Sequence, residues 1–308
     1  MKKLLLIDTF NFLHRAYHAL PKTLTDKEGN PTNAVYGVTS MLISTFSQIE
    51  PDYVLTAMDD IEPTFRVEEF TAYKAHRKPM EDDLSSQIPK VFEIIDAFGI
   101  ARLSLAGYEA DDVIGTMVEK YKGNDLDIIV VSNDRDLWQL VDDHVMIMNP
   151  QSKGEVDWIG EKEVVARYGF GPEKIVEYKA LKGDPSDNIP GVYGVGEKTA
   201  TKLILEFGSV EDIYKNIDKI EPESLKKKLV ESHDQAMMSK MLATIIRDAP
   251  VDLDLNDCKY STYNLGQVKE LLEKYNFRSL IKRLGFDVGS GGGKSKKTEV
   301  PENQLSLL

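Results

Sequence analysis

The sequence predicts an α/β fold built on a parallel sheet, with a helical domain after it. Three apolar runs, at residues 3–8, 53–59 and 127–132, have the length and composition of buried strands. Stretches with a helical spacing of apolar residues alternate with these runs, and strand patterns stop near residue 158. Such alternation is typical of a parallel sheet covered by helices, whereas the second half of the chain predicts short helices alone.

The predicted elements divide the chain into two domains and a tail. Helices are expected at 34–49, 84–98, 110–121 and 135–141, then at 197–207, and as amphipathic segments over 209–286. Residues 1–157 are therefore expected to form the sheet domain, with an insertion at about 60–90, and residues 158–287 the helical domain. Residues 288–308 begin with a Gly-, Ser- and Lys-rich stretch and are expected to form a flexible tail.

Length and composition limit the class of protein. A chain of 308 residues with 42% hydrophobic residues can bury two cores or one large one. Its one cysteine, Cys258, excludes an internal disulfide and a cysteine-based zinc site. The apolar start of the chain is cut off by Asp8 and predicts a strand rather than a signal peptide. No stretch is long and apolar enough to span a membrane, so a soluble, cytoplasmic protein is expected.

The formal net charge of −13 argues at first against a nucleic-acid partner. A site built of carboxylates would concentrate many of these charges in one place, where divalent ions would neutralise part of them. Local basic clusters then decide what binds where.

Aspartates stand where the predicted strands end. Asp8 and Asp59 are the last residues of the first two strands, and Asp134 and Asp136 closely follow the third. In parallel α/β sheets, ligands bind beyond the carboxyl ends of the strands. A single aspartate there would be an ordinary loop residue, but acids at three strand ends predict a shared site.

A second acidic signal is the cluster Glu109, Asp111 and Asp112, just before an apolar run of helical period. One or two acids in a first turn are favourable because they face the positive end of the helix dipole. Three so close repel one another, which favours a cation held among them. The alternative for this stretch alone is a solvated acidic helix start.

The insertion after Asp59 is the most basic part of the first half, with Lys74, His76, Arg77 and Lys78 close together. Connections of this length in compact domains tend to be functional or mobile. It is either a solvated surface loop or an arch that contacts phosphates beside the acids.

The central feature of the helical domain is the segment 183–207. Asp184 and Asp187 add two carboxylates, and a turn with three glycines then opens the helix 197–207. Backbone N–H groups at a helix start bind phosphate without requiring particular side chains. Lys198 and Lys202, one turn apart, reinforce this prediction of a phosphate site. The glycines are Gly191, Gly194 and Gly196.

The acids together predict a reaction. Oxygen-only ligands suit two Mg²⁺ or Mn²⁺ ions rather than zinc. Two such ions can activate a water and stabilise the leaving oxygen of a phosphoryl displacement. No nucleophilic Ser or Cys constellation and no Walker-type loop competes, so metal-dependent phosphodiester hydrolysis is expected. The nine candidate ligands are Asp8, Asp59, Glu109, Asp111, Asp112, Asp134, Asp136, Asp184 and Asp187.

Over residues 3–287 the chain resembles the 5′-nuclease (flap endonuclease) family, most closely the bacterial type found at the N-terminus of DNA polymerase I and as free-standing enzymes. The motifs that carry the resemblance are residues 109–115, 134–136 and 183–200. The resemblance implies a PIN-like (resolvase-like) nuclease domain with a C-terminal helix–hairpin–helix domain. It also implies that the nine acids hold the metals. The implied activity is structure-specific 5′→3′ exonuclease and flap endonuclease cleavage of 5′-ended DNA in primer removal, replication or repair.

The resemblance also assigns roles outside the acids. Lys74 and Arg77 are the catalytic side chains that position the scissile phosphate in an arch admitting the single-stranded 5′ end. The turn at 183–207 is the helix–hairpin–helix element that grips duplex DNA, in this family often with a bound K⁺ ion. The residues expected to contact DNA are Arg15, Tyr73, Gly191, Gly194, Gly196, Lys198, Thr199 and Lys202.

The chain departs from the family pattern at two points. Thr9 stands where Gly usually follows the first aspartate, and Asp59-Asp60 replaces a single acid. Strand register assigns Asp59 to the metal and leaves Asp60 as the alternative. Neither change removes a ligand.

No polymerase domain is expected after residue 287, and the chain is either a complete product or an excised domain. Its ending is similar to the peptide that docks bacterial replication proteins onto the sliding clamp, with a chance apolar ending as the alternative. The expected partners are branched or 5′-ended duplex DNA, RNA-primed DNA included, and this clamp; a monomer is expected. The competing functions are a catalytically silent DNA-junction-binding protein and a nuclease acting on RNA. The clamp-binding residues would be Gln304, Leu305, Leu307 and Leu308.

Overall fold

A six-stranded sheet forms the centre of the molecule in the computed structural model, which describes all residues except 124, 152–154, 261–263 and 287–308. The strand order is β3-β2-β1-β4-β5-β6, and the first five strands run parallel while β6 pairs antiparallel with β5. The predicted parallel α/β fold is confirmed. The strands are β1 (Lys2–Asp8), β2 (Tyr53–Ala57), β3 (Ala101–Leu103), β4 (Leu126–Val131), β5 (Val145–Pro150) and β6 (Val156–Ile159).

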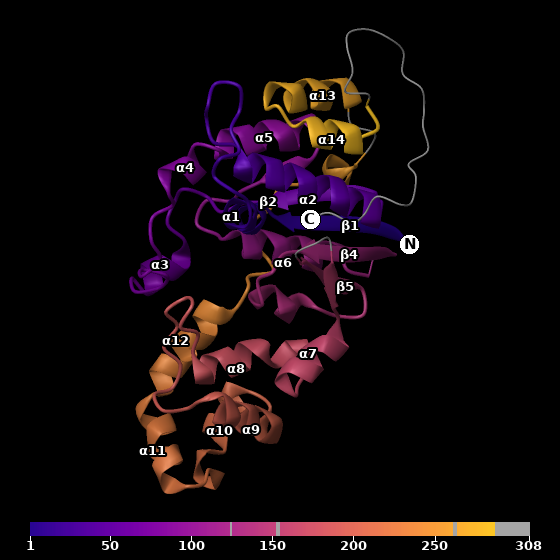
Figure 1. Cartoon of the computed structure of the whole chain (residues 1–308). Helices are drawn as coiled ribbons and strands as arrows, with labels where there is room; N and C mark the ends of the chain where they lie inside the picture. The colour runs from indigo at the N-terminus through magenta and orange to yellow at the C-terminus, as the bar shows by residue number, and fades with distance from the viewer. Residues whose placement is uncertain (124, 152–154, 261–263, 287–308) are drawn as a thin grey trace.

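The central strands are apolar on both sides because helices cover both faces of the sheet. Side chains alternate between the faces, so Leu4 and Leu6 of β1 enter one core while Leu5 and Ile7 enter the other. One face carries α1, α2, α5, α13 and α14, and the other carries α6 (Figure 1). These helices are α1 (Thr9–Ala19), α2 (Asn33–Ile49), α5 (Ile88–Ala97), α6 (Ala110–Tyr121), α13 (Leu265–Lys274) and α14 (Arg278–Arg283).

The remaining helices continue from the α6 side of the sheet and form the lower half of Figure 1. Their core is continuous with the core under α6. Helix α7 ends at Gly169, whose φ of +83° is readily adopted only by glycine. The elements are α7 (Glu161–Tyr168), η3 (Pro172–Lys174), α8 (Ile175–Lys182), α9 (Glu197–Phe207), α10 (Val210–Lys215), η4 (Ile217–Lys219), α11 (Glu223–Glu231) and α12 (His233–Ala243).

The insertion between β2 and α5 holds two short helices, α3 (Phe65–Glu69) and α4 (Asp82–Ser85), with loops around them. Tyr73 is buried in a small core with Ile189 and Leu242, so the insertion packs against the helical part. The amide of Lys74 donates to the Asp187 carbonyl at 3.0 Å. This segment is therefore anchored at its base beside the acidic loop 184–187.

The structure differs from the predicted elements in several places. The second strand ends at Ala57 rather than at residue 59, and β3, β5 and β6 were not predicted. The helix expected over 84–98 is interrupted after α4, and residues 135–141 form the 3₁₀ helix η1 (Asp136–Leu140). The helices predicted at 34–49, 110–121 and 197–207 agree within one residue with α2, α6 and α9.

The division at residues 157 and 158 stays a prediction. Helices α13 and α14 pack with α2 and α5 on the sheet, after a short 3₁₀ turn, η5 (Leu255–Cys258). The clamp peptide at 304–308 lies outside the described residues. Among the described helices, none combines the length and apolar character that crossing a bilayer requires.

Candidate active site

Six carboxylates from four segments line one hollow of about 550 Å³, called here the acidic hollow. They come from the end of β1, the loop after β2, the start of α6 and the loop after β4. The convergence follows from topology, because β2, β1 and β4 are neighbours and their carboxyl ends share one edge of the sheet. The six acids are Asp8, Asp59, Asp60, Glu109, Asp111 and Asp134.

Hydrogen bonds hold these acids in place. Asp8 caps α1 by accepting from the Asn11 amide at 3.0 Å, and its other oxygen accepts from the Ser132 hydroxyl at 3.1 Å. Asp59 accepts from the Ala110 amide at 2.8 Å, at the start of α6. Asp60 instead accepts from the Ser104 hydroxyl at 2.8 Å. Both members of the Asp59-Asp60 pair line the hollow, so the choice between them as ligand stays open.

The acids of this hollow disfavour one another's ionised form, which contributes to the raised pKa values of Asp8 and Asp111. Burial, together with the nearby Asp59 and Asp134 carboxylates, raises the pKa of Asp8 to about 7, against the hydrogen bonds from Asn11 and Ser132. Burial, together with Asp134 and Asp8, raises the pKa of Asp111 well above its usual range. Buried carboxylates that disfavour one another's ionisation are a site in which a cation is stabilising.

Glu109 and Asp112 form a capping box at the start of α6. Glu109 accepts from the backbone at Asp112, and the Asp112 carboxylate accepts from the Glu109 amide at 3.0 Å. Both Asp112 oxygens also face the guanidinium of Arg66, each at 2.7 Å. Asp112 is fully buried and accepts a further bond from the Ile246 amide at 2.8 Å. Of the three clustered acids, Asp112 is thus turned away from the hollow, whereas Glu109 and Asp111 line it.

Basic side chains of the insertion form ion pairs with the acids. Lys74 Nζ lies 2.9 Å from Glu109 Oε1 and 3.8 Å from Asp187 Oδ2, and Arg77 donates to Asp187 Oδ1 at 2.6 Å. The Tyr73 hydroxyl donates to Glu109 at 3.2 Å and to Asp187 at 3.4 Å. Asp187 is therefore joined to the insertion, and Lys74 and Arg77 stand at the wall of the acidic hollow.

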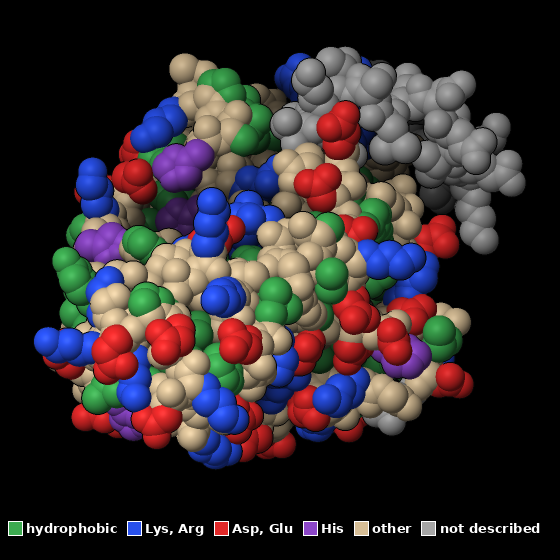
Figure 2. Space-filling model, turned by 90° about the horizontal axis from the view of Figure 1, so that it is seen from below, with side chains coloured by type: hydrophobic (Ala, Val, Ile, Leu, Met, Phe, Trp, Pro, Cys, Tyr) green, Lys and Arg blue, Asp and Glu red, His purple; other side chains and the backbone are tan. Residues whose placement is uncertain are grey.

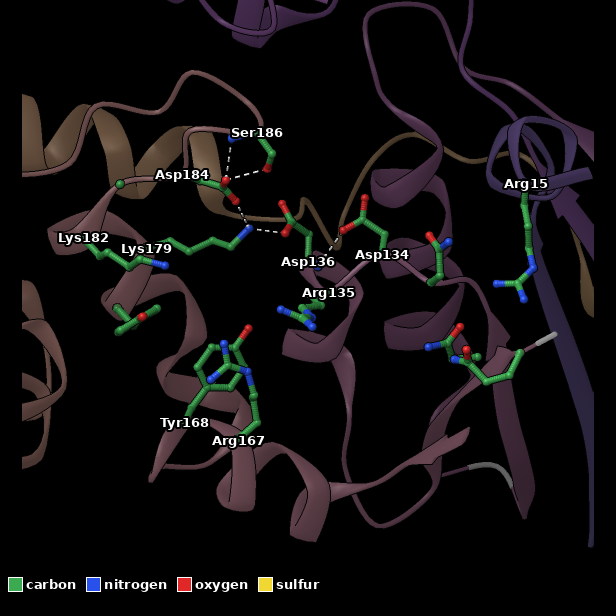
Figure 3. A pocket seen from close by; sticks show the side chains of 15 residues that line it. Arg15, Asp134, Arg135, Asp136, Arg167, Tyr168, Lys179, Lys182, Asp184 and Ser186 are labelled. Carbon is green, nitrogen blue, oxygen red and sulfur yellow. Dashed lines mark hydrogen bonds and ion pairs between the residues drawn. The ribbon is translucent and has the colours of Figure 1, made fainter. Parts of the chain in front are cut away.

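A second hollow of about 600 Å³ adjoins the first and shares Arg15, Asn133 and Asp134 with it (Figure 3). Asp136 and Asp184 face each other there, with the Lys179 ammonium hydrogen-bonded to both, at 2.6 Å in the case of Asp184 Oδ2. Burial raises the pKa of Asp136 to about 6, against the attraction of Lys179. Burial would also raise the pKa of Asp184, but Lys179 and Ser186 bring it below its usual range.

The nine predicted ligands are thus brought together in part. Within the described residues, no three acids, histidines or cysteines stand in an arrangement that holds an ion as they are placed. The set is nevertheless all oxygen and mutually repelling, which fits hard divalent cations. Five candidates line the acidic hollow, two more line the second, Asp187 joins the insertion and Asp112 pairs with Arg66.

The glycine turn begins where α8 ends, at Gly183. Gly183 and Gly191 have φ of +77° and +64°, and a Cβ at Gly191 would overlap the Gly183 backbone. The Gly191 amide donates to Ser239 of α12 at 3.0 Å, which fixes the turn against that helix. Gly196 precedes α9, on which Lys198 and Lys202 are exposed and Thr199 is half-buried. Gly183 lines the second hollow, whereas Gly191, Gly196, Lys198, Thr199 and Lys202 line neither hollow.

Several residues that line the hollows or pair with their acids were not predicted, Arg66, Lys179 and His14 among them. Arg66 and Lys179 are only 2% and 7% exposed, and each pairs with an acid more than 40 positions away. Lys179 does carry a sequence signal, because it shares the buried face of α8 with Ile175 and Tyr178. A lysine on an apolar helix face indicates a buried partner. His14 lines the acidic hollow, although no histidine was assigned to a site.

The fold and the site together define a resolvase-like α/β nuclease domain joined to a helical nucleic-acid-binding domain. The family model for the 5′-3′ exonuclease N-terminal resolvase-like domain matches residues 3–169, and that for the 5′-3′ exonuclease C-terminal SAM fold matches residues 170–265. The chain belongs to the 5′-3′ exonuclease family.

Relatives agree with this assignment, and two solved structures share the fold. The chain is 42% identical over 310 residues to DNA polymerase I of Caldicellulosiruptor bescii and 41% identical over 287 residues to that of Bacillus subtilis. These alignments cover 99% and 93% of this chain but only 36% and 32% of the polymerases, so the chain spans about a third of their length. The T5 D15 protein, co-crystallised with metal ions, superposes with a TM-score of 0.65 at 20% identity, over 92% of this chain and 100% of that one. The catalytic core of Rad2, in complex with a DNA substrate, does so with a TM-score of 0.60 at 17% identity, over 92% of each chain.

Proposed function

We propose that this chain is a divalent-metal-dependent 5′-nuclease that hydrolyses phosphodiester bonds in 5′-ended flaps and duplex DNA, including RNA-primed strands. The observation that carries the proposal is the acidic hollow, in which six carboxylates face two arch cations, Lys74 and Arg77. Acids alone would repel a phosphodiester. Acids beside cationic side chains can hold metal ions and a phosphate in the same place.

The acids divide between the two hollows in a way that fits two ions. Asp8, Asp59, Glu109 and Asp111 would hold one, and Asp136 and Asp184 the other, with Asp134 on the wall between the hollows. Asp187, which lines neither hollow, would join the second set. Bound Mg²⁺ or Mn²⁺ would supply an activated water and charge stabilisation of the leaving oxygen. Asp112 is better suited to position Glu109 and Asp111, because Arg66 and two backbone amides occupy its oxygens.

The arch residues would act on the phosphate. Lys74 and Arg77 bind carboxylates through Nζ and a guanidinium nitrogen, and both groups also suit a phosphate oxygen. Tyr73, whose hydroxyl bridges Glu109 and Asp187, would keep the base of the arch aligned with both sets of acids. Arg15, on the wall common to the two hollows, would contact the cleaved DNA strand where it passes between them.

Duplex binding is assigned to the turn at 183–207. The backbone at Gly191, Gly194 and Gly196 would contact duplex phosphates, with a K⁺ ion as a further expected ligand. Lys198, Thr199 and Lys202 would reinforce this contact from the first turns of α9. Asp184 and Asp187 lie in the same 183–207 segment as the turn, while the other acids lie at the edge of the sheet, so the turn would hold a duplex beside the acids that act on its 5′ single strand.

The proposal is tested by incubating a 5′-end-labelled flapped duplex with the full chain in Mg²⁺, in EDTA, and with the Asp111→Asn variant in Mg²⁺. Release of the flap near the junction in Mg²⁺ alone, and loss of release in the variant, are expected. Tight flap binding without cleavage by the unaltered chain would instead indicate a silent junction-binding protein.

A further inference from the structure

The second hollow has a charge opposite to that of the first. Five cations line it, Arg15, Arg135, Arg167, Lys179 and Lys182, against three carboxylates. The acidic hollow has three cations against six carboxylates. In a chain of net charge −13, whose acidic and basic side chains are interspersed over the face in Figure 2, a hollow with an excess of cations stands out. Beside the ion that Asp136 and Asp184 would hold, the rest of this hollow is therefore expected to bind an anionic group.

Among the described residues, three of these cations form no ion pair with a carboxylate: Arg15, which also lines the acidic hollow, Arg135 and Lys182. Lys179 is committed to Asp136 and Asp184, and Arg167 lies 3.6 Å from Glu197. Arg135 and Lys182 are exposed, and within the part of the chain that the structure describes neither forms an ion pair with a carboxylate. Both lie over aromatic rings, Arg135 at 5.9 Å from the Trp138 ring centroid and Lys182 at 5.3 Å from that of Tyr178.

Aromatic rings give the hollow a second kind of surface. Tyr168 and Tyr178 line it, and Tyr168 is half-buried, with the Arg167 guanidinium over its ring at 5.4 Å and Phe170 stacked on it at 5.6 Å (Figure 3). Cations beside partly exposed rings suit a nucleotide, because the cations bind the phosphate and the ring stacks on the base. The volume of about 600 Å³ accommodates one or two nucleotides rather than a duplex.

The position of the hollow relates it to the cleaved bond. It shares Asp134 and Arg15 with the acidic hollow, and the arch residues Lys74 and Arg77 line only the acidic hollow. We propose that the second hollow is a nucleotide subsite for the cleaved strand, on the side of the scissile phosphate opposite the arch. Arg135 and Lys182 each bind a backbone phosphate there, and the Arg167–Tyr168 pair packs against the adjoining base. This subsite rests on the proposed nuclease function.

The test compares the unaltered chain with the double variant Arg135→Gln/Lys182→Gln. The control Lys162→Gln/Lys259→Gln removes two exposed positive charges that line neither hollow. Binding of a flapped duplex is measured in EDTA, by fluorescence anisotropy, at several salt concentrations. For the double variant we expect about tenfold weaker binding and a salt slope smaller by about 1.4–1.8, since each lost phosphate contact contributes roughly 0.7–0.9. The control should match the unaltered chain.

Single methylphosphonate substitutions along the cleaved strand then locate the contact. The unaltered chain should lose affinity at one or two phosphates on the duplex side of the cleavage position, and the double variant should be insensitive at those same phosphates. In parallel, Tyr168→Ala should weaken binding more than Tyr168→Phe, which keeps the ring.

The outcomes separate the two claims. Cleavage by the unaltered chain with unchanged binding and salt slope in the double variant would overturn the subsite and leave the nuclease intact. Sensitivity confined to the uncut strand would overturn it as well. If the unaltered chain fails to cleave, the nuclease assignment fails, and a methylphosphonate pattern lost in the double variant would still establish the subsite as a strand-binding site.

Discussion

Asp112 and Asp111 are adjacent in the sequence, yet the structure predicts opposite consequences when each is neutralised. Asp112 is fully buried, and its oxygens accept two bonds at 2.7 Å from Arg66, itself 2% exposed. Removing one partner of a buried ion pair typically costs about 3–5 kcal/mol, because the other charge is left buried and uncompensated. Asp112→Asn should therefore lower the free energy of unfolding by about that amount.

Asp111→Asn provides the matched control. Burial and neighbouring acids raise the pKa of Asp111, so its charge opposes folding when no cation is bound. Urea unfolding in EDTA should show Asp111→Asn as stable as the unaltered chain or more so, and Asp112→Asn as clearly less stable. If Asp112→Asn were as stable as the unaltered chain in EDTA while losing Mg²⁺ binding, Asp112 would be a metal ligand and the assignment of a positioning role would be refuted.

Three further predictions concern binding, pH and the turn. Asp111→Ala should abolish flap cleavage while leaving junction binding intact or improved, since binding depends on the arch and the turn. Fluorescence anisotropy in EDTA measures the binding. Cleavage near the normal rate would contradict the assignment of Asp111 to the active site. Because the pKa values of Asp8 and Asp136 are raised to about 7 and about 6, the folded state binds protons more tightly than the unfolded state. The free energy of unfolding in EDTA should therefore fall as pH rises from 5 to 7.5, and Mg²⁺ should remove most of this fall. Thermal unfolding across this pH range measures the effect. A stability that rises with pH would contradict the prediction. Gly191→Ala should weaken duplex binding at least tenfold and destabilise the chain by more than about 1 kcal/mol, because φ is +64° and a Cβ would overlap the Gly183 backbone. Gly29→Ala is the control, since Gly29 also has a positive φ but lies in open space. Equal effects of the two substitutions would count against the packing argument.

The sheet and most of its acids could be predicted because their signals are local. β1, β2 and β4 are apolar runs buried on both sides; β1 ends in an aspartate, and β2 and β4 are followed by one within a few residues. The start of α6 could be predicted exactly, since its capping acids precede a clear helical period. The strand β3 has only three residues and is partly exposed, so no window of sequence contains enough pattern to reveal it.

The site could be predicted as a set of acids but not as a set of contacts. Asp112 has the same residue type and neighbourhood as Asp111, and only the fold brings Arg66 to one of them. Lys179 meets Asp136 across 43 positions, which spacing along the chain cannot encode. Antiparallel β6 was missed for a similar reason, because its pairing with β5 at the sheet edge leaves alternate residues half exposed.

The central claim is that the converging acids hold two divalent ions that act together on a phosphodiester. The most direct measurement is the single-turnover rate of 5′-flap cleavage as a function of Mg²⁺ concentration, with enzyme in excess over substrate. The account predicts no cleavage without metal and a rate that rises with the second power of Mg²⁺ concentration before saturating. A first-power rise, or cleavage that persists in EDTA, would contradict it.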